Sequence, residues 1–317
     1  MKKIYALAIL PLISLNAAAV QGGNAVSWEK NDDTVSMECT GTIIGGQWVL
    51  TAAHCEQKAV LGVNTWNNNT VPVSVVHNHP EWVPDMNLDV SIWRLSSKVD
   101  TNAATFFSSS DVQAGQQVSV LGFGGTYPEL NRAVFKVEPF IDVAPHRINL
   151  SEIGQGASFA GDSGAAYRNE NSEIVGVLRS DDGIKLSAFS QFVLDTVNGW
   201  HYPTLANTNA DGGSVTVTVQ SLHQDVVADA AFTTGDATIV GGSCSGAQLV
   251  PFETCTYEIS SNGYEGTLNL AEGQSVTINK DRTKPEPPKP DQGGDSGGSL
   301  GWFVLSLLGC AAAARRR

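Results

Sequence analysis

One tetrapeptide near the middle of the chain has the residue types that acyl transfer needs. Gly161-Asp162-Ser163-Gly164 follows a stretch of small residues that is typical of neither a regular helix nor a regular strand. A serine in such a turn can hold its hydroxyl and the neighbouring backbone N–H groups toward a cleft, which supplies a nucleophile and donors for an oxyanion. The same four residues also form ordinary turns, so the tetrapeptide by itself does not establish catalysis.

The tetrapeptide occurs a second time, as Gly294-Asp295-Ser296-Gly297 with Gly298 after it. This copy follows residues 283–290, a proline-rich run that cannot pack a core and favours extended polyproline conformation. No strand-like segment flanks the second copy, and an apolar segment follows it directly. We therefore expect Ser163, and not Ser296, to be the nucleophile.

A histidine beside a cysteine is the next candidate. The apolar residues 48–50 lead into Thr51-Ala52-Ala53-His54-Cys55, and Cys39 lies 16 positions before Cys55. A bridge between the two cysteines would clamp the histidine segment to the preceding strand and stabilise the fold by about 3 kcal/mol. The cysteines could instead be free or bind a metal, although a Cys-His-Cys set with no fourth ligand nearby argues against zinc. A lone histidine is more often structural than catalytic.

Taken in chain order, these segments resemble the chymotrypsin/trypsin family of serine proteases, over about residues 20 to 202. The segment that ends in His54-Cys55 is similar to the family's histidine segment. Three further stretches match in the family's order, namely 87–92 as the aspartate segment, 116–124 as a strand end with Phe in place of Trp, and 174–178 as the strand after the serine. The resemblance implies an all-β fold with a chymotrypsin-like double β-barrel.

The resemblance also implies a catalytic triad of Ser163, His54 and Asp89. Ser163 would attack the scissile carbonyl, His54 would accept and return the proton, and Asp89 would orient His54. The N–H groups of Gly161 and Ser163 would form the oxyanion hole. Asp89 alone could equally be a turn carboxylate, but three motifs in order, at intervals of 35 and 74 residues, are more specific than any one of them. The intervals are short for the family, so we expect trimmed surface loops.

The start of the mature chain is a further point of resemblance. In this family the free N-terminus pairs with the aspartate before the catalytic serine, which here implies a pair between Val20 and Asp162. The small residues 17–19 form a signal-peptidase site that abuts Val20, with no propeptide ending in a basic residue between them. We expect signal-peptide removal itself to generate the activating terminus. The alternative is a flexible terminus, since Gln21 departs from the family's valine.

The specificity pocket departs from the family. The residues in the matching positions are Ala157 at the floor, Asp181 at the wall and Ser187. Ala157 is not the acid of the trypsin branch, and Phe159 replaces a cysteine of the usual supporting bridge. Asp181 or Asp182 could reach a basic side chain, and a small or apolar pocket is equally compatible. These departures leave room for a catalytically inactive relative.

Several segments must position or accompany this site. We expect the protease-like domain to occupy 20–205 and to close with a helix near 191–200, and 202–213 to be a linker. A small β-sandwich-like module at 206–280 should follow, with alternating strands at 214–220, 237–240, 255–259, 266–270 and 275–278. Cys244 and Cys255 should form a disulfide, because the hydrophobic core of so small a module is marginally stable and a disulfide would stabilise it. The module could be a spacer or bind a surface or substrate.

The two ends of the chain predict export and sorting. Residues 1–19 have the charged, apolar and small-residue regions of a signal peptide. At the other end, a Pro/Gly-rich linker (281–299) precedes an apolar segment with a terminal arginine cluster (300–317). This end resembles the bacterial GlyGly-CTERM sorting signal, which implies a transient membrane tail, cleavage by rhombosortase near Gly297-Gly298, and type II secretion. A permanent membrane anchor is the alternative.

Composition limits the partners. The formal charge of −13 should repel nucleic acid and anionic membrane surfaces, and no dinucleotide-binding fingerprint is present. We expect no cofactor, no metal, and no calcium in the asparagine-rich loop 64–70. The partners expected are a protein or peptide substrate, signal peptidase, the secretion machinery and rhombosortase. The chain is thus predicted to be a serine endopeptidase of the periplasm and then the cell surface or medium. The alternative is a catalytically inactive protease-fold surface protein that acts in binding or adhesion.

Overall fold

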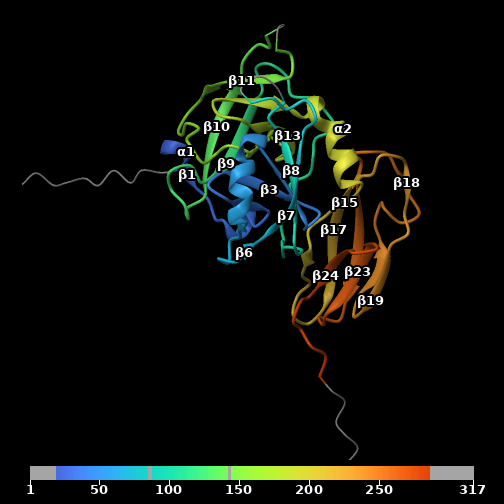
Figure 1. Cartoon of the computed structure of the whole chain (residues 1–317). Helices are drawn as coiled ribbons and strands as arrows, with labels where there is room; N and C mark the ends of the chain where they lie inside the picture. The colour runs from blue at the N-terminus through green and yellow to red at the C-terminus, as the bar shows by residue number, and fades with distance from the viewer. Residues whose placement is uncertain (1–18, 85–87, 142–143, 286–317) are drawn as a thin grey trace, which may run out of the picture. The chain divides into compact units, whose positions relative to one another are not determined.

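The computed structural model describes residues 19–84, 88–141 and 144–285, in which β-strands predominate (Figure 1). A first antiparallel sheet of seven strands has the order β6-β5-β2-β3-β4-β8-β7. Its strands are β2 (Thr34–Ser36), β3 (Thr40–Ile44), β4 (Trp48–Thr51), β5 (Val63–Asn64), β6 (Thr70–Val71), β7 (Val73–Asn78) and β8 (Ser91–Leu95). Its interior holds a buried cluster that includes Met37, Val49 and Trp93. Burial of this apolar surface is what makes the sheet curl around its own core.

A second seven-stranded sheet has the order β1-β10-β11-β14-β13-β12-β9, and β9 also pairs with β10, so that the sheet closes on itself. Its strands are β1 (Asn24–Ala25), β9 (Gln117–Gly122), β10 (Asn131–Val137), β11 (Arg147–Glu152), β12 (Ala166–Arg168), β13 (Ile174–Leu178) and β14 (Asp182–Lys185). Every second residue of β10 is buried, as expected of a strand with one face toward a core. The two barrel-like sheets confirm the predicted chymotrypsin-like double barrel.

A third apolar cluster joins residues of both barrels, among them Leu50 and Ile92 from the first and Val177 and Ile184 from the second. Helix α2 (Leu186–Val197) adds its apolar stripe to this cluster, with Leu186, Phe189, Val193, Leu194 and Val197 buried. The helix begins five residues before the predicted start and ends at Val197, and the C-cap residue Asn198 adopts a left-handed conformation with φ of 38°. Three short helices complete these parts of the chain, namely α1 (Ala19–Gly22), η1 (Glu29–Asn31) and η2 (Ala53–Leu61).

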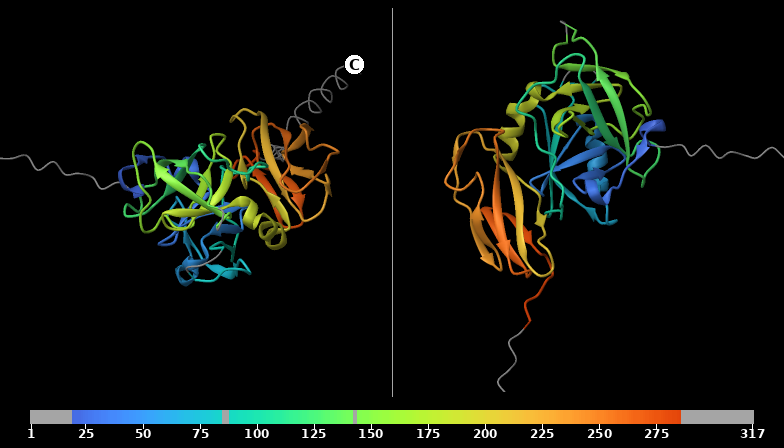
Figure 2. Two further views of the ribbon diagram at one scale, coloured as in Figure 1. Left: turned by 90° about the horizontal axis from the view of Figure 1, so that it is seen from above. Right: turned by 180° about the vertical axis from the view of Figure 1, so that it is seen from behind.

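The module after α2 consists of two four-stranded sheets and a short two-stranded sheet. One sheet has the order β15-β17-β22-β20, with β15 (Gly199–His201), β17 (Gly213–Leu222), β20 (Thr238–Gly241) and β22 (Thr254–Ser261). The other has the order β16-β24-β23-β19, with β16 (Leu205–Ala206), β19 (Phe232–Gly235), β23 (Gly266–Ala271) and β24 (Gln274–Ile278). Strands β18 (Val227–Ala228) and β21 (Gln248–Leu249) form the two-stranded sheet. One buried cluster, with Tyr257, Leu268 and Val276, receives side chains from both sheets, and Figure 2 shows these orange-to-red strands in two further views.

The sequence predicts a linker at 202–213, whereas strand β16 lies within this range and strand β15 begins before it. β15 pairs with β17 from Gly199↔Leu222 to His201↔Gln220, and β16 pairs with β24 in parallel. Trp200 and Tyr202 are buried in the module's own core. Because these aromatic side chains pack with the sandwich, the sheet pairing assigns residues from Gly199 onward to the module.

Both predicted disulfides are present, Cys39–Cys55 in the first barrel and Cys244–Cys255 in the module. Among the residues that the structure describes, no helix is long and apolar enough to cross a membrane. The predicted signal peptide up to residue 18, the sorting residues Gly297 and Gly298, Ser296 and the segment 300–317 lie outside the described residues.

Candidate active site

Two paired strands bring His54 and Asp89 together. β4 pairs with β8 through Thr51↔Ser91, His54 is the second residue of the helical turn η2 after β4, and Asp89 lies two residues before β8. The Asp89 side chain is buried, and its Oδ2 lies 2.6 Å from Nδ1 of His54. Its Oδ1 accepts the backbone N–H of His54 at 2.8 Å. With Nδ1–H directed at the carboxylate, Nε2 of His54 is the nitrogen that can accept a proton.

The turn that carries Ser163 is tied to the first barrel by hydrogen bonds. The N–H of Thr40 donates to the carbonyl of Ser163 at 2.8 Å, and the Thr40 hydroxyl donates to the carbonyl of Gly161 at 2.9 Å. Gly161 and Gly164 have φ of 107° and 87°. A Cβ at Gly164 would lie 2.0 Å from Oγ1 of Thr51, so this turn requires glycine there.

Ser163, His54 and Asp89 line one cavity of about 320 Å³. Trp82, Pro84, Arg179 and Ser180 complete its lining. Among the described residues no hydrogen bond joins the Ser163 hydroxyl to His54. Such bonds commonly tighten only when substrate binds. The structure thus brings the three predicted triad members to one cleft.

Two backbone donors beside Ser163 are available to a ligand. Within the described part of the chain, the N–H groups of Gly161 and Ser163 donate to no protein acceptor, whereas that of Asp162 between them donates to the carbonyl of Phe159 at 3.0 Å. The carbonyl of Gly161 is held by Thr40, which fixes the peptide plane on that side. Uncommitted N–H groups in a fixed turn are what an oxyanion hole requires.

Asp162 points away from the cleft into the second barrel. Its carboxylate is fully buried and accepts the N–H groups of Gly124 at 2.7 Å and Phe159 at 2.8 Å. It packs so closely on Gly122 and Gly124 that a Cβ at either position would collide with it. Burial raises the pKa of Asp162 above its ordinary value, and the two backbone hydrogen bonds oppose that rise.

Val20 lies in the same barrel. Its side chain is fully buried in the cluster that contains Val118 and Val120, and α1 packs on β9 and β10. Val20 has a φ of 42°, which is strained for a β-branched residue. β9 ends at Gly122, the residue on which Asp162 packs. In the chain described, Val20 is preceded by Ala19 and its nitrogen belongs to a peptide bond.

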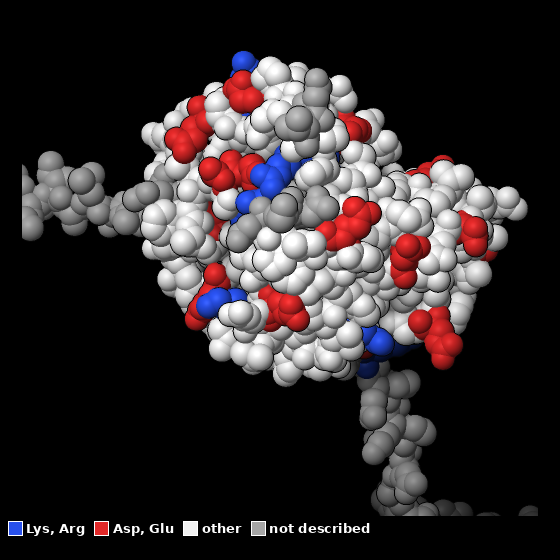
Figure 3. Space-filling view, turned by 45° about the horizontal axis from the view of Figure 1, so that its top comes forward, with Lys and Arg blue, Asp and Glu red and all other residues white. Residues whose placement is uncertain are grey.

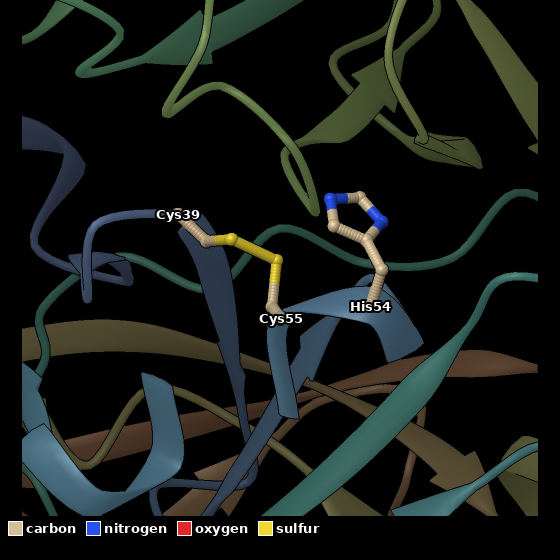
Figure 4. Close-up of side chains that lie close together, drawn as sticks. All are labelled: Cys39, His54 and Cys55. Atoms are coloured by element: carbon tan, nitrogen blue, oxygen red, sulfur yellow. A yellow bond between two sulfur atoms is a disulfide. The ribbon is translucent and has the colours of Figure 1, made fainter. Parts of the chain in front are cut away.

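The cysteines beside His54 form a disulfide, with the imidazole next to it (Figure 4). The ligand atoms of Cys39, His54 and Cys55 lie within 4.8 Å of one another. A disulfide has no thiolate to offer a metal, so this donor set does not fit a metal centre. The alternatives that the sequence left open for these cysteines are settled in favour of the bridge.

The three residues expected in the specificity pocket are not gathered at Ser163. Ala157 is half-buried and is not among the residues that line the cleft, and Asp181 is exposed and accepts the Ser180 hydroxyl at 2.9 Å. Ser187 lies in the first turn of α2 and donates to Asp111 at 2.9 Å. It lines a different cavity, of about 350 Å³, with residues such as Ser108 and Phe252.

Sequence reasoning missed the role of Arg179 as a wall of the cleft. Arg179 lies two residues before Asp181, the residue expected at the wall of the pocket, but only the structure shows its side chain at the cleft. Another cavity, of about 540 Å³, adjoins Gly161 on the side of the disulfide and is lined by residues that include Glu38, Phe123 and Tyr127.

The fold and the arrangement of these residues are those of a trypsin-like serine protease. The Trypsin family model matches residues 18–194, which is more than half of the chain, and the chain therefore belongs to the trypsin family. It is 32% identical to trypsin II-P29 of Gallus gallus over 110 residues, or 29% of this chain and 44% of that protein. The chain thus spans less than half the length of this curated relative.

Three solved structures are similar in fold. The VesB protease of Vibrio cholerae has a TM-score of 0.47 and 19% identity, with 82% of this chain and 98% of that chain covered. The secreted serine protease VesC of Vibrio cholerae has a TM-score of 0.46 and 17% identity, with 81% and 70% covered. The inactivated protease paralogue S-I1 of the scabies mite has a TM-score of 0.46 and 19% identity, with 55% and 99% covered.

Proposed function

We propose that this chain is an exported serine endopeptidase that hydrolyses peptide bonds through an acyl-enzyme. The observation that carries the proposal is that Asp89 contacts both the backbone and the ring of His54. His54 shares one cleft with Ser163, next to two backbone N–H groups that donate to no acceptor among the described residues. Membership of the trypsin family supports a serine peptidase. The two disulfides support folding in an oxidising compartment.

The chemistry follows from these positions. The Ser163 oxygen forms a bond to the scissile carbonyl carbon while its proton moves to Nε2 of His54. The carbonyl oxygen becomes an oxyanion that accepts the N–H groups of Gly161 and Ser163. The carbon–nitrogen bond then breaks, and the departing amine takes the proton from His54. Water repeats the two steps on the ester, which releases the acid and restores Ser163. Asp89 stabilises the imidazolium in each half-reaction.

We further propose that cleavage before Val20 activates the enzyme by an ion pair between the new α-ammonium and Asp162. Asp162 is a buried carboxylate with two backbone donors and, in the described chain, no cation. Cleavage would remove the peptide bond that defines φ of Val20, and with it the strain at that residue. In this proposal signal peptidase makes the cut. Sorting by rhombosortase near Gly297-Gly298 and passage through type II secretion remain proposals from the sequence.

A fluorophosphonate probe tests the catalytic proposal, because only an activated serine reacts readily with it. The exported protein should label, Ser296→Ala should label equally, and Ser163→Ala should not label at all. N-terminal sequencing of the labelled protein should give Val20. Absence of labelling in a correctly processed, folded protein would contradict the proposal and favour a non-catalytic binding protein. Full labelling of a form with extra residues before Val20 would contradict the activation step alone.

A further inference from the structure

The cleft beside Ser163 is lined by a charged side chain, that of Arg179, which has no role in the proposed function. Asp182, one of the two acids expected to reach a basic substrate side chain, is already paired. Its Oδ2 accepts Nη1 of Arg147 at 3.1 Å, and its Oδ1 lies 3.6 Å from Nε of Arg179. Two guanidinium groups therefore flank this one carboxylate and already offset its charge, although its Oδ1 accepts no hydrogen bond from the described residues.

The hydrogen-bond donors of the Arg179 guanidinium are largely unused. Its side chain is only 19% exposed and lines the cleft with Ser163 and His54. Among the described residues its guanidinium donates no hydrogen bond, and Nη1 is buried with no acceptor. A guanidinium has five N–H donors in a fixed fork, and leaving them unpaired away from water is costly. The side chain thus has donors available for an acceptor that enters the cleft.

The other charged group that lines the cleft is already engaged. Both oxygens of Asp89 are bonded to His54. Asp181 is exposed nearby, bonded to Ser180, and does not line the cleft. On the face shown in Figure 3, acidic side chains are spread over the surface and basic ones gather in a few places. In a chain with a formal charge of −13, a half-buried arginine whose hydrogen-bond donors are unused at the cleft is an unusual feature.

We propose that Arg179 is a specificity-determining residue that selects a carboxylate side chain in the substrate, at one of the two residues before the scissile bond. An aspartate or glutamate there would give the guanidinium the paired acceptor that the fork matches. The inference rests on the proposed peptidase function, and it assigns the cleft a charge preference opposite to that expected from Asp181 or Asp182.

The first test measures kcat/KM for matched fluorogenic peptides that differ only in Glu or Gln at each of these two positions, per labelled active site. We expect Glu to be preferred by about tenfold to a hundredfold at one position, as for hydrogen bonds to charged groups. Arg179→Gln should abolish the preference, and Arg179→Lys should retain part of it, because lysine keeps the charge without the fork. Lys136→Gln, which removes one exposed positive charge from β10, should leave the preference unchanged.

A second test needs no turnover. In the Ser163→Ala full chain, calorimetry should show tighter binding of the Glu peptide than of the Gln peptide, and the added Arg179→Gln change should equalise the two. Equal binding of both peptides by Ser163→Ala, or a Glu/Gln ratio unchanged by Arg179→Gln, would overturn the inference. A protein without fluorophosphonate labelling would instead overturn the proposed catalysis, and the binding measurement would still decide the role of Arg179.

Discussion

At the scale of single residues, the candidate site depends on the two contacts that the Asp89 carboxylate makes with His54. Asp89 uses one oxygen to hold the backbone of His54 and the other to hold its ring. The first contact fixes where the histidine starts, and the second selects the tautomer with its free nitrogen toward the cleft. A carboxylate that only capped a turn would make the first contact and not the second.

The Asp89→Asn variant should therefore fold normally but hydrolyse peptides much more slowly. An amide can still accept the backbone N–H of His54, but it cannot stabilise the imidazolium or enforce the tautomer. We expect kcat to fall by about 10³- to 10⁴-fold. Peptide hydrolysis per correctly folded molecule measures the effect, and Asp111→Asn, a carboxylate outside the triad cleft, is the control. A loss no larger than that of Asp111→Asn would exclude Asp89 from the triad.

At the scale of elements, the serine turn is positioned by strands of the opposite barrel. Thr40 at the start of β3 holds Gly161 and Ser163, and Thr51 at the end of β4 packs against Gly164. The disulfide Cys39–Cys55 joins the residue before β3 to the histidine turn. The nucleophile of one barrel and the base of the other are thus held by the same pair of strands.

Gly164→Ala tests this packing. A Cβ there would lie 2.0 Å from Oγ1 of Thr51 and 2.4 Å from the carbonyl oxygen of Thr40. Gly115 offers a matched control, because it has the same φ of 87° and no atom within 4 Å of an added Cβ. We expect Gly115→Ala to cost about 1–2 kcal/mol from the left-handed backbone alone, and Gly164→Ala to cost several kcal/mol and reduce fluorophosphonate labelling. Urea unfolding measures both. Equal losses of unfolding free energy in the two variants would show that contacts with Thr40 and Thr51 do not restrict the turn at Gly164.

At the scale of the whole described fold, the barrels and the module share buried contacts. Leu222 of β17 belongs to the cluster between the barrels, and Gln220 is fully buried. The Gln220 side chain accepts the N–H of Phe107 and donates to the carbonyls of Phe107 and Phe252. His201 of β15 accepts the N–H of Gly45 at 3.1 Å and contacts the carbonyl of Thr105 at 2.9 Å.

His201 makes the fold sensitive to acid. Burial lowers its pKa to about 4 from the ordinary 6.5, so the folded state favours the neutral ring. The resulting stability is fully present above pH 6.5 and is lost as pH falls through 4, with a total of about 3 kcal/mol. His201→Gln keeps a donor and an acceptor without a titrating group. We expect the free energy of unfolding, measured in urea between pH 7 and pH 4, to fall less for His201→Gln than for the wild type. Parallel curves would show that His201 does not carry the acid sensitivity.

The sequence alone was sufficient for features that depend on local order and pattern. Gly161-Asp162-Ser163, His54-Cys55 and the stretch with Asp89 stand in the order of the family that they resemble, and this resemblance implied the double barrel and the candidate triad. Both cysteine pairs are close in sequence, so the two bridges could be expected. The longer module strands were visible because alternating burial leaves a period of two in the sequence.

The tertiary structure decided what depends on packing between distant segments. β15 and β16 are too short to show a period, and only the burial of Trp200 and Tyr202 assigns them to the module. Ser187 was expected at the pocket, but α2 begins at Leu186 and carries it to another cavity. Arg179 lines the cleft, and Asp182 at the start of β14 lies 3.6 Å from its Nε. Which side chain lines a cleft is set by the paths of loops and by competing partners, and neither of these is encoded in any one stretch of sequence.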